Sequence, residues 1–230
     1  MEKNILRLFD VYARVDIVFD TASSKEVKQF IERHNGDGKR FDYDLKEGDV
    51  LDASFHKFVH SNRAELARAV RKCWSKESGR LPNGKVLIIA GPDELAEKLE
   101  QGHTSVNDYL LESNHVEADT RLLLHANALF VDDYRHVVIQ SIDTDVTLIA
   151  IAKGASIGLC SLHIHSFNQV AKTSTYINCL QIVQDLRAMY DDIDPFELLP
   201  LHALSGCDST SFIHNVTKVK FFSTYFDSYP

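Results

Sequence analysis

Carboxylates placed at the ends of expected strands and helices are the residues of this sequence best suited to chemistry. Asp143 and Asp145 stand two positions apart in QSIDTDV, directly after an apolar run. Asp20 closes the apolar run RVDIVFD in the same way, and Glu117 and Asp119 open the helix-like stretch VEADTRLLLHANALF. Either charge of that pair suits the positive end of a helix.

A fourth stretch, LSGCDSTS, places Asp208 in an expected tight turn after a short helix. Acidic groups that gather in one place repel one another unless positive charge lies among them. Hard divalent cations such as Mg²⁺ and Mn²⁺ bind through carboxylate oxygens and supply that charge. Two such ions about 4 Å apart activate water and stabilise the leaving oxygen of a phosphodiester. The residue types therefore suggest metal-dependent phosphodiester cleavage.

Each motif taken alone has a simpler interpretation. A single aspartate at a strand end usually serves a cap or a turn, and D-x-D occurs in glycosyltransferases, phosphatases and calcium-binding loops. His115 and His202 stand beside the acidic motifs, where they either position substrate or cap and pack. HIH at residues 163–165 invites a zinc interpretation but has no third ligand at zinc-like spacing. The joint order of the four acidic motifs is what favours a functional site.

Strands alternating with helices are expected to position these carboxylates. Short β-branched apolar runs predict buried parallel strands at residues 14–20, 85–91 and 136–143. Apolar residues recurring every four positions predict an amphipathic helix at residues 63–74. This alternation indicates an α/β protein, in which ligand sites collect beyond the carboxyl ends of the strands.

Composition bounds the alternatives. A chain of 230 residues fits one domain, and 44% hydrophobic with 25% charged residues is typical of a globular protein. The formal net charge of −8 argues against general affinity for nucleic acid, so phosphate contacts need local basic groups or metal ions. No apolar run is long enough to cross a membrane and no signal peptide is recognisable, which predicts an intracellular protein, nuclear or cytoplasmic, without a membrane partner.

Two segments lack a clear period. Residues 33–49 are glycine-rich and charged, and we expect a mobile loop there. The carboxyl-terminal stretch FFSTYFDSYP is aromatic but unpatterned and is compatible with a last strand or with a segment cut from a longer protein. The four cysteines form no C-x-x-C pair, so we expect reduced thiols.

The order of the acidic motifs resembles that of the flap-endonuclease and XPG-like 5′-nucleases of the PIN-like superfamily. In that family a VFDG strand end, an EAEA helix start, a D-x-D strand end and a G-x-D-Y turn carry the metal ligands. The matching pieces here are VFDT, VEADT, SIDTD and SGCDST. The quoted motifs also resemble those of uncharacterised, often transposon-associated animal proteins that carry EEADTR, SPDTDV and HAxTGCDSTS.

This resemblance implies a single three-layer PIN-like domain over residues 1–230 with a mainly parallel central sheet. It implies two Mg²⁺ or Mn²⁺ ions and a structure-specific nuclease that cleaves DNA or RNA, branched or single-stranded. The catalytic and metal-binding residues that it implies are Asp20, Glu117, Asp119, Asp143, Asp145 and Asp208. Asp16 is a further candidate on the strand of Asp20.

The resemblance also implies roles for basic residues and a shortened chain. The helical segment after Asp20 stands where flap nucleases have a basic arch, so Lys25, Lys28 and Arg33 would contact phosphates. An upstream strand with a further aspartate and a helix-turn-helix after the last aspartate have no counterpart, which indicates a fragment or shortened form that lacks the first strand. A catalytically inactive PIN-like module that binds nucleic acid or a protein is the alternative, and another metal-dependent phosphotransferase or phosphatase is a third.

Overall fold

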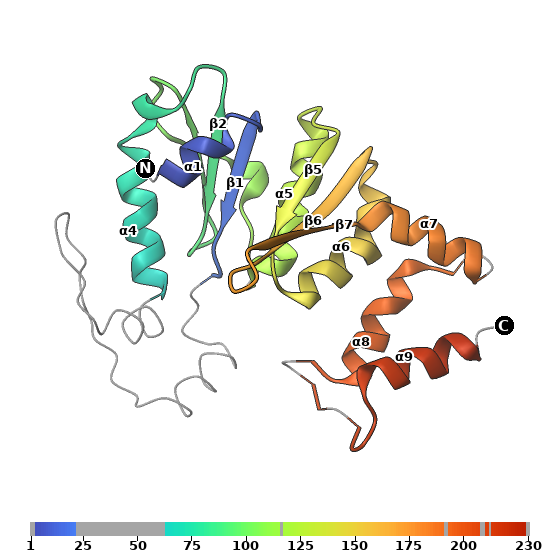
Figure 1. The fold of residues 1–230 in the computed structure, drawn as a ribbon. Coiled ribbons are helices and arrows are strands. Elements are labelled where there is room, and N and C mark those ends of the chain that lie inside the picture. The colour runs from blue at the N-terminus through green and yellow to red at the C-terminus, as the bar shows by residue number, and fades with distance from the viewer. Residues whose placement is uncertain are drawn as a thin grey trace, which may run out of the picture. The chain divides into compact units, whose positions relative to one another are not determined.

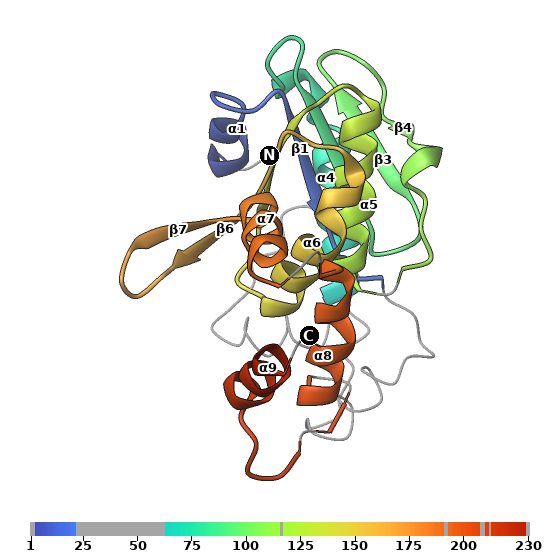
Figure 2. The same cartoon turned by 90° about the vertical axis from the view of Figure 1, so that its right-hand side faces the viewer.

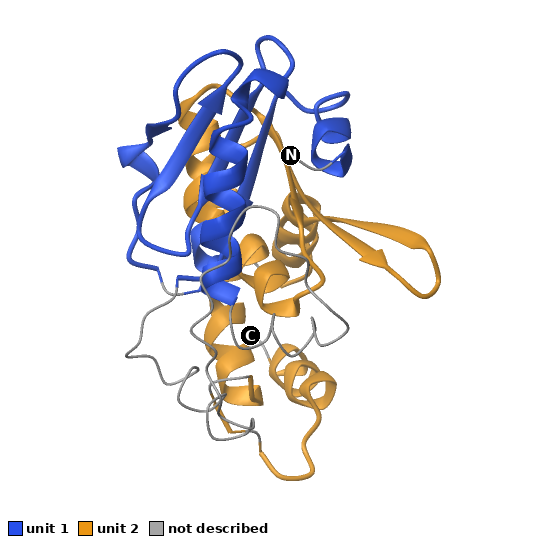
Figure 3. Ribbon diagram, turned by 90° about the vertical axis from the view of Figure 1, so that its left-hand side faces the viewer, with its two compact units in different colours: residues 1–121 blue, residues 122–230 orange. Residues whose placement is uncertain are grey.

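The computed structural model describes residues 3–21, 63–115, 117–190, 193–207, 210–211 and 213–228. The chain divides into two compact units, Met1–Arg121 and Leu122–Pro230, and the described strands form one sheet in each (Figures 1 and 3). The α/β class predicted from the sequence is confirmed. The segment expected to be a mobile loop, residues 33–49, and the three basic candidates Lys25, Lys28 and Arg33 lie outside the described residues.

Unit 1 contains a four-stranded sheet in the order β1-β2-β3-β4. Its elements are α1 (Lys3–Leu8), β1 (Arg14–Val18), α4 (Arg63–Ser75), η1 (Ser78–Arg80), β2 (Val86–Ala90), β3 (Ala96–Glu100), β4 (Val106–Asn107), η2 (Tyr109–Leu111) and the start of α5 (Ala118–Val131). Strands β1 and β2 are parallel, with Arg14 opposite Val86 and Val18 opposite Ala90, and the other pairs are antiparallel.

The core of unit 1 forms around β2, whose sequence VLIIA is almost wholly buried, as its continuous apolar run predicts. Leu87, Ile89 and Leu99 pack there with side chains of α1 and with Trp74 of α4. Gly91 ends β2 at a φ of +86°, and a Cβ on it would lie 2.6 Å from the carbonyl oxygen of Phe19. Only glycine therefore lets the chain leave β2 so close to the chain that leaves β1.

Unit 2 contains a three-stranded sheet in the order β5-β6-β7. Its elements after α5 are β5 (His136–Gln140), α6 (Thr144–Ile157), β6 (Ser161–Asn168), β7 (Thr173–Asn178), α7 (Cys179–Met189), η3 (Pro195–Glu197), α8 (Leu198–Ser205) and α9 (Lys218–Asp227). Strands β5 and β6 are parallel and joined through α6, whereas β6 and β7 form an antiparallel hairpin that extends outward from α7 (Figure 2).

The core of unit 2 lies between this sheet and its helices. Val137 and Ile139 alternate with exposed residues on β5 and pack with Val146 and Ala150 of α6. Gly154 allows α6 to approach β6, because a Cβ at this position would lie 2.5 Å from the side chain of Leu162. The crossover helix that carries Asp145 is thus held closely against its own sheet.

The structure differs from the sequence-based expectation in two respects. Of the five pairings among the described strands, only β1–β2 and β5–β6 are parallel. Each sheet is therefore mixed rather than mainly parallel. The aromatic stretch forms helix α9 as far as Asp227 rather than a last strand, because Thr217 caps the helix and Phe222 and Phe226, four positions apart, pack on the core. Searching the described residues for a helix long and apolar enough to span a membrane finds none.

Candidate functional site

In unit 1 the structure brings Asp20 to the start of α5. Asp20 lies just beyond the end of β1, and its Oδ1 accepts a hydrogen bond of 2.9 Å from the backbone N–H of Ala118, the first residue of α5. The hydroxyl of Thr21 donates to the carbonyl oxygen of His115 at 2.7 Å. Segments almost a hundred positions apart in sequence are therefore bonded together at this point.

Glu117 and Asp119 flank the residue that Asp20 contacts. Glu117 precedes Ala118 and is exposed, whereas Asp119 lies in the first turn of α5 and is half-buried. The first amides of a helix have no partner within the helix and carry partial positive charge, so they favour nearby carboxylates. Three acidic residues thus lie at one helix end, where part of their mutual repulsion is offset.

Asp16, the additional candidate on β1, has a different role. Its two carboxylate oxygens receive the Nε–H and Nη2–H groups of Arg14, both at 2.7 Å. Both side chains are almost inaccessible, with 8% and 3% of their surface exposed. A carboxylate neutralised by a buried arginine is a structural group, so Asp16 is not part of the candidate site.

In unit 2 Asp143 caps helix α6. Its φ and ψ angles of −81° and 132° are those of an N-cap, and its Oδ1 accepts from the N–H of Asp145 at 2.9 Å. The N–H of Asp143 donates to the hydroxyl of Ser141 at 3.0 Å, and the hydroxyl of Thr147 donates to the Asp143 carbonyl at 3.2 Å. These contacts fix the backbone between β5 and α6. Both carboxylates follow the strand, as expected, with Asp143 at the N-cap and Asp145 in the first turn.

Asp145 contacts a histidine of α8. The Nε2 atom of His202 lies 2.9 Å from Asp145 Oδ1, and 33% of the aspartate side chain but only 10% of the histidine is exposed. The Nδ1 atom of His202 lies 3.1 Å from the Nζ atom of Lys218 at the start of α9. Sequence reasoning noted His202 but predicted no contact for it, and it did not consider Lys218. The backbone of His115 accepts a hydrogen bond from the Thr21 hydroxyl and donates one to the Ser113 hydroxyl.

Asp208 lies outside the described residues. Helix α8 ends at Gly206, whose φ is +97°, as the sequence predicts. On either side of Asp208, the N–H of Thr210 donates a hydrogen bond to the carbonyl oxygen of Cys207 at 3.2 Å. The hydroxyl of Thr210 donates to the carbonyl oxygen of Ala203 at 2.6 Å. The ends of the predicted turn are thus tied to the end of α8.

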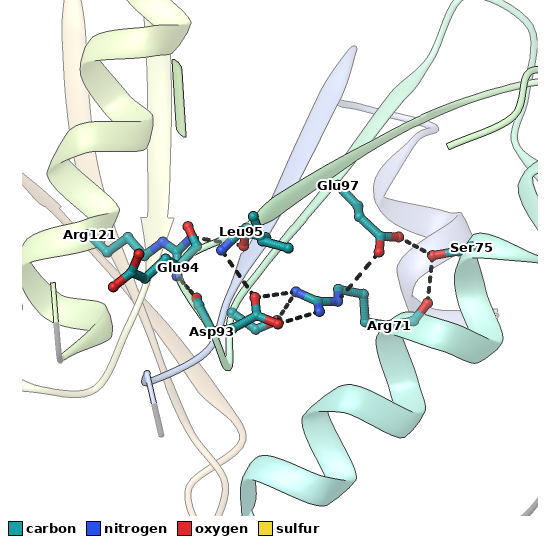
Figure 4. A network of polar contacts seen from close by, with 8 residues as sticks. Arg71, Ser75, Asp93, Glu94, Leu95, Glu97 and Arg121 are labelled. Carbon is teal, nitrogen blue, oxygen red and sulfur yellow. Dashed lines mark hydrogen bonds and ion pairs between the residues drawn. The ribbon is translucent and has the colours of Figure 1, made fainter. Parts of the chain in front are cut away.

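Arg121, which sequence reasoning missed, anchors the acidic start of α5. Its side chain is fully buried. Its Nη atoms donate to the carbonyl oxygens of Asp93, Glu94 and Leu95 at 2.8 to 2.9 Å (Figure 4). They also donate to the carbonyl oxygen of Leu111 at 3.3 Å. Burial lowers the pKa of Arg121 from its ordinary value, although a guanidinium stays charged near neutral pH. The arginine directly after VEADT in an otherwise apolar stretch was the available signal.

A second arginine holds the same loop from the other side. Arg71 of α4 binds both carboxylate oxygens of Asp93 at 2.6 Å and donates to the carbonyl of Gly91 at 2.9 Å (Figure 4). The hydrogen bond from Arg71 holds the pKa of Asp93 below its usual value and raises that of Arg71. Ser75 and Arg71 also contact Glu97. The loop between β2 and β3 is therefore fixed to α4 and to α5.

The donor chemistry of both acidic groups suits a hard divalent cation. Within the described ranges, no three His, Cys, Asp or Glu side chains lie close enough together to share one ion. Mg²⁺, however, commonly keeps several waters and uses only one or two protein carboxylates together with substrate phosphates. Carboxylate groups such as those at the starts of α5 and α6 meet that smaller requirement.

Comparison of the chain with protein-family models, with curated proteins and with solved structures finds no match.

Proposed function

We propose that this protein is a metal-dependent nuclease with a three-layer PIN-like fold. The observation that supports this proposal best is a repeated arrangement. In each unit, the first strand of a parallel pair is followed by an aspartate, Asp20 or Asp143, that accepts a hydrogen bond from a first-turn amide of a helix. Each of these helices carries a further carboxylate in its first turn.

The proposal assigns the six carboxylates to two Mg²⁺ or Mn²⁺ ions. When bound, such ions supply Lewis-acid chemistry that activates water and stabilises the charge that develops on a phosphodiester. The chain itself supplies rigid placement, because Asp20 and Asp143 are each fixed by a backbone amide. The ligands in this proposal are Asp20, Glu117, Asp119, Asp143, Asp145 and Asp208.

The substrate in this proposal is DNA or RNA with a branched or single-stranded region. A polyanion approaches a chain of net charge −8 only where cations offset the repulsion. Bound metal ions provide that charge at the carboxylates, and Lys25, Lys28 and Arg33 are proposed to provide it along the strand.

A catalytically inactive module is the competing hypothesis, and one observation favours it. The Oδ1 atoms of Asp20, Asp143 and Asp145 each already take part in a structural hydrogen bond. A carboxylate has about four lone-pair sites over its two oxygens, so one such bond leaves room for a metal ion. Measurement of metal binding and cleavage therefore separates the two hypotheses.

The test compares the wild type with Asp143→Asn. Asparagine is as good an N-cap as aspartate, so the variant keeps the α6 cap but loses one ligand charge. We expect calorimetry to show Mg²⁺ binding to the wild type, and we expect a labelled single-strand flap and a hairpin RNA to be cleaved with Mg²⁺ or Mn²⁺ but not with chelator. The variant should lose metal affinity and cleavage by orders of magnitude.

Asp194→Asn is the matched control. Asp194 is exposed and caps η3 in the same manner, accepting from the N–H of Phe196 at 3.0 Å, and it belongs to none of the acidic motifs. Its variant should behave as the wild type. Cleavage that persists in chelator, or equal cleavage by Asp143→Asn, would reject the metal-nuclease proposal, whereas the absence of both binding and cleavage in the wild type would favour the inactive module.

A further inference from the structure

A chain of three polar side chains leads from α9 through α8 to the start of α6. Lys218 Nζ lies 3.1 Å from His202 Nδ1, and His202 Nε2 lies 2.9 Å from Asp145 Oδ1. His202 is 8% exposed, so its ring is held among packed atoms rather than in water. Both ring nitrogens therefore have a defined partner.

The chemistry of the two partners fixes the direction of these hydrogen bonds. A lysine ammonium has three donors and no acceptor, so Nδ1 must accept and carry no proton. An ionised carboxylate only accepts, so Nε2 must donate. One neutral tautomer of His202, with its proton on Nε2, satisfies both contacts. A histidine protonated on both nitrogens would direct an N–H toward an ammonium group.

We propose that His202, locked in this tautomer by Lys218, is a positioning residue that orients the carboxylate of Asp145 for its ligand; the metal part of this inference rests on the proposed function. A hydrogen bond to Oδ1 fixes the rotation of the carboxylate and leaves Oδ2 to a cation. Groups that hold a metal ligand in this way typically change metal affinity by about 10- to 100-fold when they are removed.

Helix α9 keeps Lys218 in place. Thr217 accepts from the N–H of Lys220 at 3.2 Å and so begins the helix directly before Lys218. Phe222 and Phe226 of the same helix pack against the core of unit 2. Because the helix is anchored by these rings, the ammonium reaches His202 from a fixed position.

Four variants test the inference. His202→Ala removes the donor to Asp145, whereas His202→Gln replaces Nε2–H with an amide N–H at a similar reach and should rescue it. Lys218→Met removes the ammonium and keeps the stem. Lys220→Met, two positions further along the same helix, is the control for loss of a lysine from α9.

Nitrogen-15 spectra of the imidazole groups, with His202→Gln used to assign the signal, report the tautomer directly. We expect a protonated Nε2 and an unprotonated Nδ1 in the wild type. Lys218→Met should shift the Nδ1 signal, because the ammonium no longer donates to this atom, whereas Lys220→Met should leave both signals unchanged. A proton on Nδ1 in the wild type, or a spectrum unchanged by Lys218→Met, would overturn the lock.

Mg²⁺ calorimetry and cleavage kinetics test the consequence for the site. His202→Ala should lower Mg²⁺ affinity by about 10- to 100-fold, with kcat restored toward the wild type at saturating Mg²⁺, and His202→Gln should recover most of the loss. Metal affinity unchanged in His202→Ala, with a wild type that binds and cleaves, would overturn the inference alone. A wild type that neither binds nor cleaves would reject the proposed function and the metal role of His202 together, and the spectra would still decide the lock.

Discussion

Replacing Arg121 by methionine should strongly destabilise unit 1. Methionine keeps an unbranched apolar stem of similar reach, so the change removes the donors while it preserves much of the packing. Four carbonyl oxygens lose the guanidinium, those of Asp93, Glu94, Leu95 and Leu111. The carbonyls of Glu94 and Leu95 keep one backbone donor each, from Ser113 and Gly91. Those of Asp93 and Leu111 then have to be satisfied by water or left without this donor.

The expected loss follows from these contacts. A hydrogen bond from a charged donor contributes about 1.5 to 3 kcal/mol, and the cost of burying the guanidinium offsets part of the sum. We therefore expect the free energy of unfolding to fall by about 3 to 5 kcal/mol, which is the part of that sum that remains after the desolvation cost of the guanidinium is relieved. With a urea m-value of about 1 to 3 kcal/mol/M, the midpoint should fall by about 1 to 5 M.

Tryptophan fluorescence during urea unfolding is a direct assay for this prediction. The chain has one tryptophan, Trp74, and it packs against the core of unit 1. Arg68→Met is the control, because Arg68 and its partner Glu65 are 48% and 42% exposed and such pairs contribute about 0 to 1 kcal/mol. The control should lose less than about 1 kcal/mol of the free energy of unfolding. If Arg121→Met lost as little, the four carbonyl contacts would not be what stabilises the loop.

Two further predictions concern pH and thiol chemistry. The Arg71 hydrogen bond depresses the folded-state pKa of Asp93, so the contribution of this carboxylate to stability is complete above the unfolded pKa of about 3.9 and is lost as the pH falls through the lower folded pKa. Between about pH 5 and pH 2, the free energy of unfolding measured with urea should therefore fall less in Asp93→Asn than in the wild type. An equal fall in both proteins would contradict this prediction. Burial raises the pKa of Cys179 to about 11, whereas Cys73 and Cys160 are exposed; alkylation at pH 8 followed by mass spectrometry should modify both exposed cysteines long before Cys179, and early labelling of Cys179 in the folded protein would count against its burial.

Local pattern was sufficient for most elements that carry the candidate site. The runs at residues 14–20, 85–91 and 136–143 predict buried strands, and the structure confirms strands β1, β2 and β5 there. Only β2 is almost wholly buried, whereas β1 is half-buried and β5 alternates between buried and exposed residues. The amphipathic period predicts α4, and the glycine after LHALS predicts the end of α8. The strands β3, β4, β6 and β7 were not predicted. Helix α9 was not predicted either, because its aromatic residues obscured a four-residue spacing and left a last strand as one alternative.

The sequence alone determined that acidic residues follow strands and open helices, since caps and strand ends depend on residues within a few positions. The tertiary structure decided which groups those side chains meet. Asp20 and Ala118 are 98 positions apart, and Asp145 and His202 are 57 apart. Neither pairing follows from any local period, because a hydrogen-bond partner is selected by the packing of whole elements. Asp16 and Arg121 show the same limit, since the charge of each is visible in the sequence but only burial beside particular partners makes it structural.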